Sequence, residues 1–185
     1  RVHGRYGPIE FAMTDGGYEM SWPVLILLLC VAGQRLCELV LGSVNTRALL
    51  EHGWVEHGPR HYPLFILLHS SWLLSLFVWA LVVEPSLNWL LCGLYIFLQV
   101  GRVWVLLTLG RFWTTRIISL PDAPLIVSGP YKYARHPNYW IVVCEVALLP
   151  SVIGAWEIAG VYTVLNAVLL AHRTKIENAA LLSRR

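Results

Sequence analysis

One polar segment, residues 110–139, holds most of the side chains in this sequence that could do chemistry: GRFWTTRIISLPDAPLIVSGPYKYARHPNY. Gly129 permits a close backbone approach, and the rings of Tyr131 and Tyr139 could pack on a heterocycle or a cationic onium centre. His136 and the arginine before it offer donors to a carboxylate. The segment therefore suits a charged, aromatic small molecule, although an interfacial aromatic belt with basic anchors has a similar composition.

A second polar pair lies near the C-terminus, where Arg173 and Glu177 are four residues apart. On a helix they would share one face, one turn apart. The pair could belong to a site, or it could be an ordinary ion pair on an exposed helix.

Four charged residues stand inside otherwise apolar stretches: Arg35, Glu38, Arg102 and Glu145. Charges in a membrane segment are costly and usually face the interior of the bundle. Arg102 could line a cavity or make stabilising pairs, whereas a cavity is favoured for Glu145, which is the candidate general base. His69 is a second candidate for that role.

The composition places these residues in a membrane protein. The chain is 57% hydrophobic and only 14% charged, against about 25% charged in soluble domains. Residues 22–41, 62–83 and 87–109 are each long enough to cross a bilayer. The stretch 139–170 is too long for one crossing, and Pro150 and Gly154 divide it, which predicts a tight hairpin of two helices, about 139–153 and 155–171.

Charge asymmetry supports five crossings. With five, residues 42–61, 110–138 and 172–185 lie on one side and carry ten of the 14 lysines and arginines. By the positive-inside rule, the N-terminus is outside and the C-terminus and polar segment are cytoplasmic. We expect an all-α integral membrane protein with about five transmembrane helices, in which residues 1–21 are poorly ordered and residues 22–185 form a single domain.

Two other classes of partner are not expected. The net charge of +3 is modest and follows the membrane topology, so nucleic acid is not a predicted partner. His52, His57 and His61 could suggest zinc, but glycine and proline between them would interrupt an aligning helix. No metal site is predicted.

Several of these features occur together in one known family. The run Gly129-Pro130-Tyr131-x-x-x-Arg135-His136-Pro137-x-Tyr139 is followed by a glutamate in the next helix, a short hairpin and a final Arg-x-x-x-Glu. This combination closely resembles the isoprenylcysteine carboxyl methyltransferase family, most specifically over about residues 110–181. The resemblance implies a methyltransferase that takes S-adenosylmethionine from the cytoplasm and a lipophilic acceptor from the bilayer.

The resemblance also implies roles for particular residues. The implied cofactor site consists of Leu125, Ile126, Gly129, Tyr131, His136, Pro137, Asn138, Tyr139 and Glu177. Arg173 would face the acceptor and, with Glu145, makes up the predicted catalytic pair.

The acceptor stays open at this point. Glu177 is followed by Asn178, where protein-modifying members tend to have paired acidic residues. The chain looks more like the bacterial branch, which is associated with polyketide-derived lipids such as alkylresorcinols and alkylpyrones. A carboxylate acceptor would need no base, whereas a phenol or enol would.

Two other functions fit parts of the pattern. The element RHPxY also occurs in membrane sterol reductases, which leaves an NADPH-dependent reductase of a lipid double bond as an alternative. A non-catalytic transporter or scaffold is a third possibility.

Overall fold

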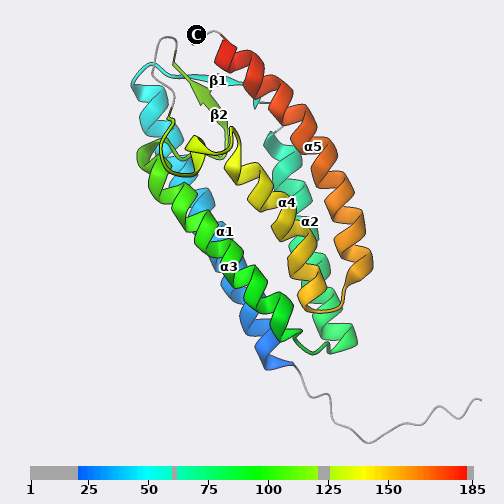
Figure 1. The fold of residues 1–185 in the computed structure, drawn as a ribbon. Coiled ribbons are helices and arrows are strands. Elements are labelled where there is room, and N and C mark those ends of the chain that lie inside the picture. Colours follow the sequence, from blue (N-terminus) through cyan, green and yellow to red (C-terminus); the bar gives the residue numbers. More distant parts are fainter. Residues whose placement is uncertain (1–20, 60–61, 121–125, 183–185) are drawn as a thin grey trace, which may run out of the picture.

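The described part of the chain folds into five α-helices joined at one end by short strands and turns (Figure 1). The structure is a computed structural model that describes residues 21–59, 62–120 and 126–182. The five helices are α1 (Trp22–Glu51), α2 (Tyr62–Val83), α3 (Trp89–Leu109), α4 (Pro137–Val152) and α5 (Trp156–Leu182). The predicted all-α membrane fold is confirmed, while the segment expected to be poorly ordered lies almost wholly outside the described residues.

Within the described residues, three helices are long and apolar enough to cross a membrane: Trp22–Glu51, Tyr62–Val83 and Trp89–Phe112. Many of their large apolar side chains face outward, as in Leu90 and Phe97, which are both 75% exposed. Such an apolar surface is stable in contact with lipid. The helices are also suited to lipid, because they satisfy their backbone hydrogen bonds internally.

The last two helices form the predicted hairpin. Helix α4 ends at Val152, and Gly154 has a positive φ of 69° in the turn. The amide of Ala155 donates to the carbonyl of Pro150 over 2.9 Å, which closes the turn. The hairpin runs α4 and α5 against each other, so the first turn of α4 meets the final turns of α5 (Figure 1).

Helix α1 is longer than the hydropathy pattern indicated. It continues to Glu51, ten residues beyond the predicted end at residue 41. Residues 42–51 (GSVNTRALLE) contain no proline and are mostly compatible with helix. The extension leaves the apolar stretch and reaches the polar end of the bundle, where it supports the loop after α3.

A two-stranded antiparallel sheet was not foreseen. Strand β1 (Val55–His57) pairs with β2 (Ile117–Ser119), with Glu56 opposite Ile118. Each strand has three residues, too few for an alternating pattern to be recognised. The pairing joins the segment after α1 to the segment after α3.

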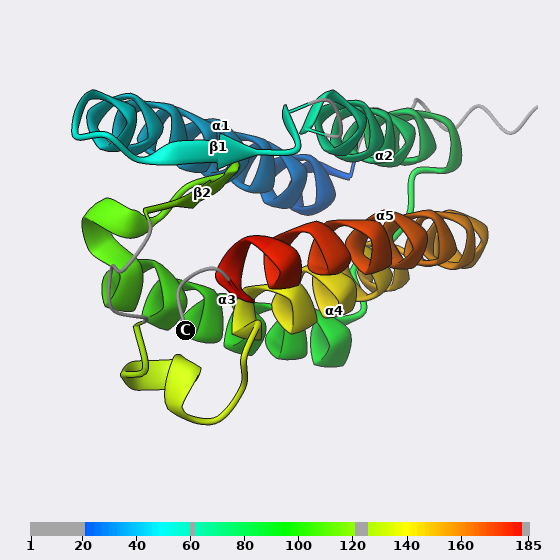
Figure 2. The same ribbon diagram turned by 90° about the horizontal axis from the view of Figure 1, so that it is seen from above.

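The apolar core and the short strands and 3₁₀ helices lie at different ends of the bundle. The core gathers buried side chains such as Leu28, Trp72, Leu76 and Leu149 near the α4–α5 turn. At the other end, the sheet and two short 3₁₀ helices, η2 (Gly110–Phe112) and η3 (Gly129–Lys132), lie over the helix ends (Figure 2). The apolar core fixes the positions of the helices relative to one another, and the opposite end holds the candidate site.

Candidate active site

The hairpin brings four predicted site residues into one polar group. His136 and Tyr139 lie at the start of α4, and Arg173 and Glu177 lie near the end of α5. Arg173 Nε donates to the Tyr139 hydroxyl over 2.7 Å, and this hydroxyl donates to Glu177 Oε2. Arg173 and Glu177 therefore meet through Tyr139, which excludes the alternative of a simple solvent-exposed ion pair.

His136 completes the group from the other side of Glu177. Its Nδ1 lies 3.6 Å from Glu177 Oε1, and its ring stacks on Tyr139 with centroids 5.2 Å apart and planes 10° apart. The Glu177 carboxylate beside it raises the pKa of His136 above its usual value, against the effect of burial. Burial would raise the pKa of Glu177, but the nearby His136 and the hydrogen bond from Tyr139 lower it overall. Near neutral pH, Glu177 is a carboxylate.

Arg173 is fixed on three sides. Its Nη1 donates to the carbonyl of Thr115 over 3.0 Å. Its guanidinium lies 5.3 Å from the ring centroid of Phe65 and 5.6 Å from that of Tyr139. Nη2 makes no hydrogen bond with the described residues, so this end of the planar fork stays available as a donor.

Residues that the sequence did not single out hold this arrangement. Asn45 on the α1 extension donates to the carbonyls of Gly110 and Trp113, over 3.1 and 2.8 Å. Gly42 lies against Thr115, whose Cγ2 would be 3.0 Å from an added Cβ. The sequence placed residues 110–118 in the polar segment, but no local pattern in α1 identified Asn45 or Gly42 as the supports of these residues.

Gly129 is required by packing within the protein. It has a φ of 55°, and an added Cβ would lie 2.4 Å from Thr108 Oγ1 of α3. The close approach expected at this glycine is thus to the end of α3, which fixes η3. Burial raises the pKa of Tyr131 in η3, and the nearby Glu177 charge raises it further. Its phenol is neutral at physiological pH.

The remaining predicted cofactor residues surround the same end of the bundle. Pro137 is buried at the first position of α4, where proline is well tolerated. Asn138 has a buried side-chain oxygen with no hydrogen-bond partner in the described part of the chain. Ile126 is half-buried, and Leu125 lies outside the described residues.

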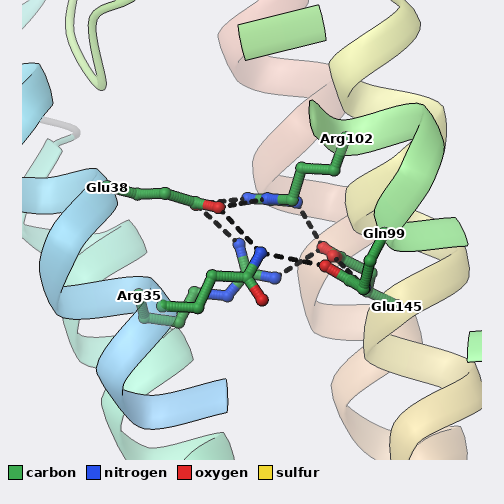
Figure 3. Close-up of polar contacts among 6 residues, drawn as sticks. Arg35, Glu38, Gln99, Arg102 and Glu145 are labelled. Carbon is green, nitrogen blue, oxygen red and sulfur yellow. Dashed lines mark hydrogen bonds and ion pairs between the residues drawn. The ribbon is translucent and has the colours of Figure 1, made fainter. Parts of the chain in front are cut away.

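The charges inside the apolar stretches form a separate network (Figure 3). Arg102 on α3 donates to Glu38 on α1 through Nε and Nη2, over 2.6 and 2.8 Å, and through Nη1 to Glu145 on α4. Arg35 pairs with Glu38 at 2.9 Å and with Glu145 at 2.8 Å. Gln99 donates to the other oxygen of Glu145 over 2.9 Å. Two guanidinium groups thus face two carboxylates.

The sequence left two interpretations of Arg102, and the network supports the one in which Arg102 makes stabilising ion pairs within the bundle. Arg102 is 4% and Glu145 is 2% exposed. Long side chains join α1 to α3 and α4 across the interior of the bundle. Both oxygens of Glu145 are occupied by donors from α1 and α3, and the structure does not bring Glu145 into the group around Arg173. Its predicted role as a base stays a prediction.

These features define an all-α membrane protein with a polar group at one end of its helical bundle. The family sequence model of isoprenylcysteine carboxyl methyltransferases matches residues 89–183, which include both arms of that group. The chain belongs to the isoprenylcysteine carboxyl methyltransferase family. Members of this family are methyltransferases that use S-adenosylmethionine as methyl donor.

Bacterial relatives extend the similarity to most of the chain. The protein YpbQ of Bacillus subtilis is 36% identical over 165 residues, which cover 88% of this chain and 96% of YpbQ. A protein of Haemophilus influenzae is 26% identical over 165 residues, covering 84% of this chain and 93% of its own length. Both are described as uncharacterized. No solved structure matches the chain.

Proposed function

We propose that the protein transfers a methyl group from S-adenosylmethionine to an oxygen of a lipophilic acceptor at the cytoplasmic face of the membrane. The convergence of His136, Tyr139, Arg173 and Glu177 carries this proposal. The group combines a carboxylate, a cation and stacked rings on helices that adjoin lipid. Residues 22–185 would form one domain, with the cofactor-binding region at about 110–181.

The residues present fit the charges of S-adenosylmethionine. Glu177 could receive its ammonium group, because each carboxylate oxygen can accept more than one hydrogen bond. The first turn of α4 has no side-chain cap, and the amide of Asn138 together with His136 could receive the carboxylate. The unpartnered oxygen of Asn138 offers an acceptor in the same turn. The rings of Tyr131 and Tyr139 suit the sulfonium centre.

The protein's contribution to the reaction would be alignment and exclusion of water. S-adenosylmethionine supplies an activated methyl group in an in-line displacement. Arg173, held by Tyr139 and Thr115, would present its free Nη2 to the acceptor oxygen. Because donor and acceptor come from different phases, holding them together in the reactive geometry should supply much of the rate acceleration.

The surroundings of the site support a lipophilic acceptor. The outward faces of α1 to α3 are apolar, which suits a prenylated or polyketide-derived lipid. A carboxylate would pair directly with the Arg173 guanidinium, and a phenolic or enolic oxygen would also need a base.

The proposed orientation places the N-terminus outside and the C-terminus with the active site in the cytoplasm. Ten of the 14 lysines and arginines belong to residues 42–61, 110–138 and 172–185, and the described parts of these segments lie at the end that carries the site. This distribution supports the orientation through the positive-inside rule.

The test is S-adenosylmethionine binding to the purified protein by titration calorimetry. We expect wild type to bind, and His136→Ala and Glu177→Ala to bind at least about 10-fold more weakly, since each removes a charge-assisted contact. His52→Ala and Glu51→Ala are matched controls at the exposed end of α1. A folded wild type that binds no S-adenosylmethionine would refute the proposal. Binding of NADPH in its place would favour the reductase.

A further inference from the structure

Four ring-bearing side chains lie along one face of α2, next to the candidate active site. Tyr62, Phe65, His69 and Trp72 follow one another at spacings of three, four and three residues, which places them on one side of a helix. The Phe65 and His69 rings stack with centroids 6.4 Å apart, and Trp72 meets His69 edge-on, also at 6.4 Å. The mechanism described above does not use His69.

A hydrogen bond fixes the tautomer of His69. Its Nδ1 lies 2.9 Å from the carbonyl oxygen of Phe65, one turn earlier in α2. A carbonyl can only accept, so Nδ1 must carry the proton. In the neutral imidazole, Nε2 then has a free lone pair. Nε2 makes no hydrogen bond with any residue that the structure describes.

The His69 ring and the Arg173 guanidinium both lie against the Phe65 ring. The Arg173 guanidinium lies 5.3 Å from the Phe65 centroid, and the His69 ring stacks on Phe65 at 6.4 Å. An aromatic or enolic acceptor packed along Phe65 could present one oxygen to both groups. Glu145 is worse placed for this task, because Arg35, Arg102 and Gln99 occupy its oxygens.

We infer that His69 is the general base of this enzyme and that the acceptor is a lipid with a phenolic or enolic hydroxyl. The inference rests on the proposed function and narrows it. The acceptor O–H bond breaks, its proton moves to His69 Nε2, and the electron pair stays on oxygen beside Arg173. The oxygen bonds to the methyl carbon of S-adenosylmethionine as the carbon–sulfur pair passes to sulfur. The proton on His69 then leaves to water.

The first test detects proton transfer from a bound phenol in the absence of methyl transfer. An alkyl nitrophenol, whose phenolate absorbs visible light, is added to protein without methyl donor at a pH where it is a phenol in detergent alone. We expect bound probe to ionise in wild type and not in His69→Asn, whose amide can keep the bond to Phe65 but has no base. His52→Asn is the matched control, because His52 Nδ1 makes the same contact with Ala48 O, at 2.7 Å. Equal ionisation in wild type and His69→Asn would overturn the inference.

The second test compares acceptors. A base typically contributes about 100-fold or more to the rate, so His69→Asn should lose about that much with an alkylphenol. With an alkyl nitrophenol, already ionised at the assay pH, the loss should be much smaller. Equal losses with both acceptors, or a wild type that methylates lipid carboxylates and no phenol, would contradict the inference.

The calorimetric test keeps the two proposals apart. If wild type binds no S-adenosylmethionine, the proposed function fails. If S-adenosylmethionine binds equally to wild type and His69→Asn while the nitrophenol result is negative, only the role of His69 fails.

Discussion

Replacing Glu145 by glutamine tests whether the buried charge network holds the helices together. The substitution keeps the size of the side chain and leaves two guanidinium groups facing one carboxylate, that of Glu38. Arg102 is 4% exposed, so water cannot compensate the excess charge. Removing one partner of a buried ion pair costs about 3–5 kcal/mol. We expect a loss of that size in the free energy of unfolding.

A second substitution should restore part of the lost stability. Arg102→Gln alone leaves an excess of negative charge and should also destabilise. In the double variant Arg102→Gln, Glu145→Gln, the remaining Arg35 and Glu38 balance each other. The double variant should therefore be more stable than the sum of the single losses predicts, by about 1–3 kcal/mol.

The measurement is reversible unfolding in mixed micelles, followed by the fluorescence of the nine tryptophans. Glu51→Gln is the control, because the Arg47–Glu51 pair is 85% and 63% exposed and should contribute no more than about 0.5 kcal/mol. Single losses under about 1 kcal/mol at Glu145, or additive losses in the double variant, would refute the structural role. Loss of phenol turnover with unchanged stability would instead support Glu145 as the base.

Three further outcomes are expected. Gly129→Ala should lower the melting temperature in thermal unfolding, because left-handed backbone strain costs about 1–2 kcal/mol and the new Cβ meets Thr108. Adding Thr108→Ala removes the contact but not the strain, so it should rescue only part of the loss. Tyr139→Phe removes the hydroxyl that bridges the arginine and the glutamate and should weaken S-adenosylmethionine binding by about 1–3 kcal/mol in calorimetry. The raised pKa of His136 and the lowered pKa of Glu177 mean that their pair stabilises the fold most between those values. Stability should fall as pH rises through the pKa of His136, and separately as pH falls through that of Glu177. His136→Gln should abolish the loss on the alkaline side in melting curves recorded against pH.

Local and compositional signals accounted for much of the fold. Lipid tolerates only segments that satisfy their own backbone groups, so runs of about 20 apolar residues were enough to locate α2 and α3. Gly154 marked the hairpin because its positive φ falls in the turn between α4 and α5. Pro150 did not interrupt the helix where the sequence predicted, since it lies inside α4, two residues before the helix ends. The end of α1 was wrong by ten residues, since hydropathy follows the apolar stretch and not the helix. The β1–β2 pairing joins segments about 60 residues apart, and no local pattern specifies such a contact.

The candidate site was likewise predicted in part from the sequence. The types and spacing of His136, Tyr139, Arg173 and Glu177 could be read from the sequence, because side-chain chemistry and helical period are local properties. That Tyr139 bridges the two residues of α5 follows only from how the α4–α5 hairpin packs. The pairing of Glu145 with two arginines is likewise tertiary, since hydropathy records the cost of a buried charge but not the partner that offsets it. The sequence by itself thus determined the class of protein and its reactive groups, and the packing of the helices decided which of these groups meet.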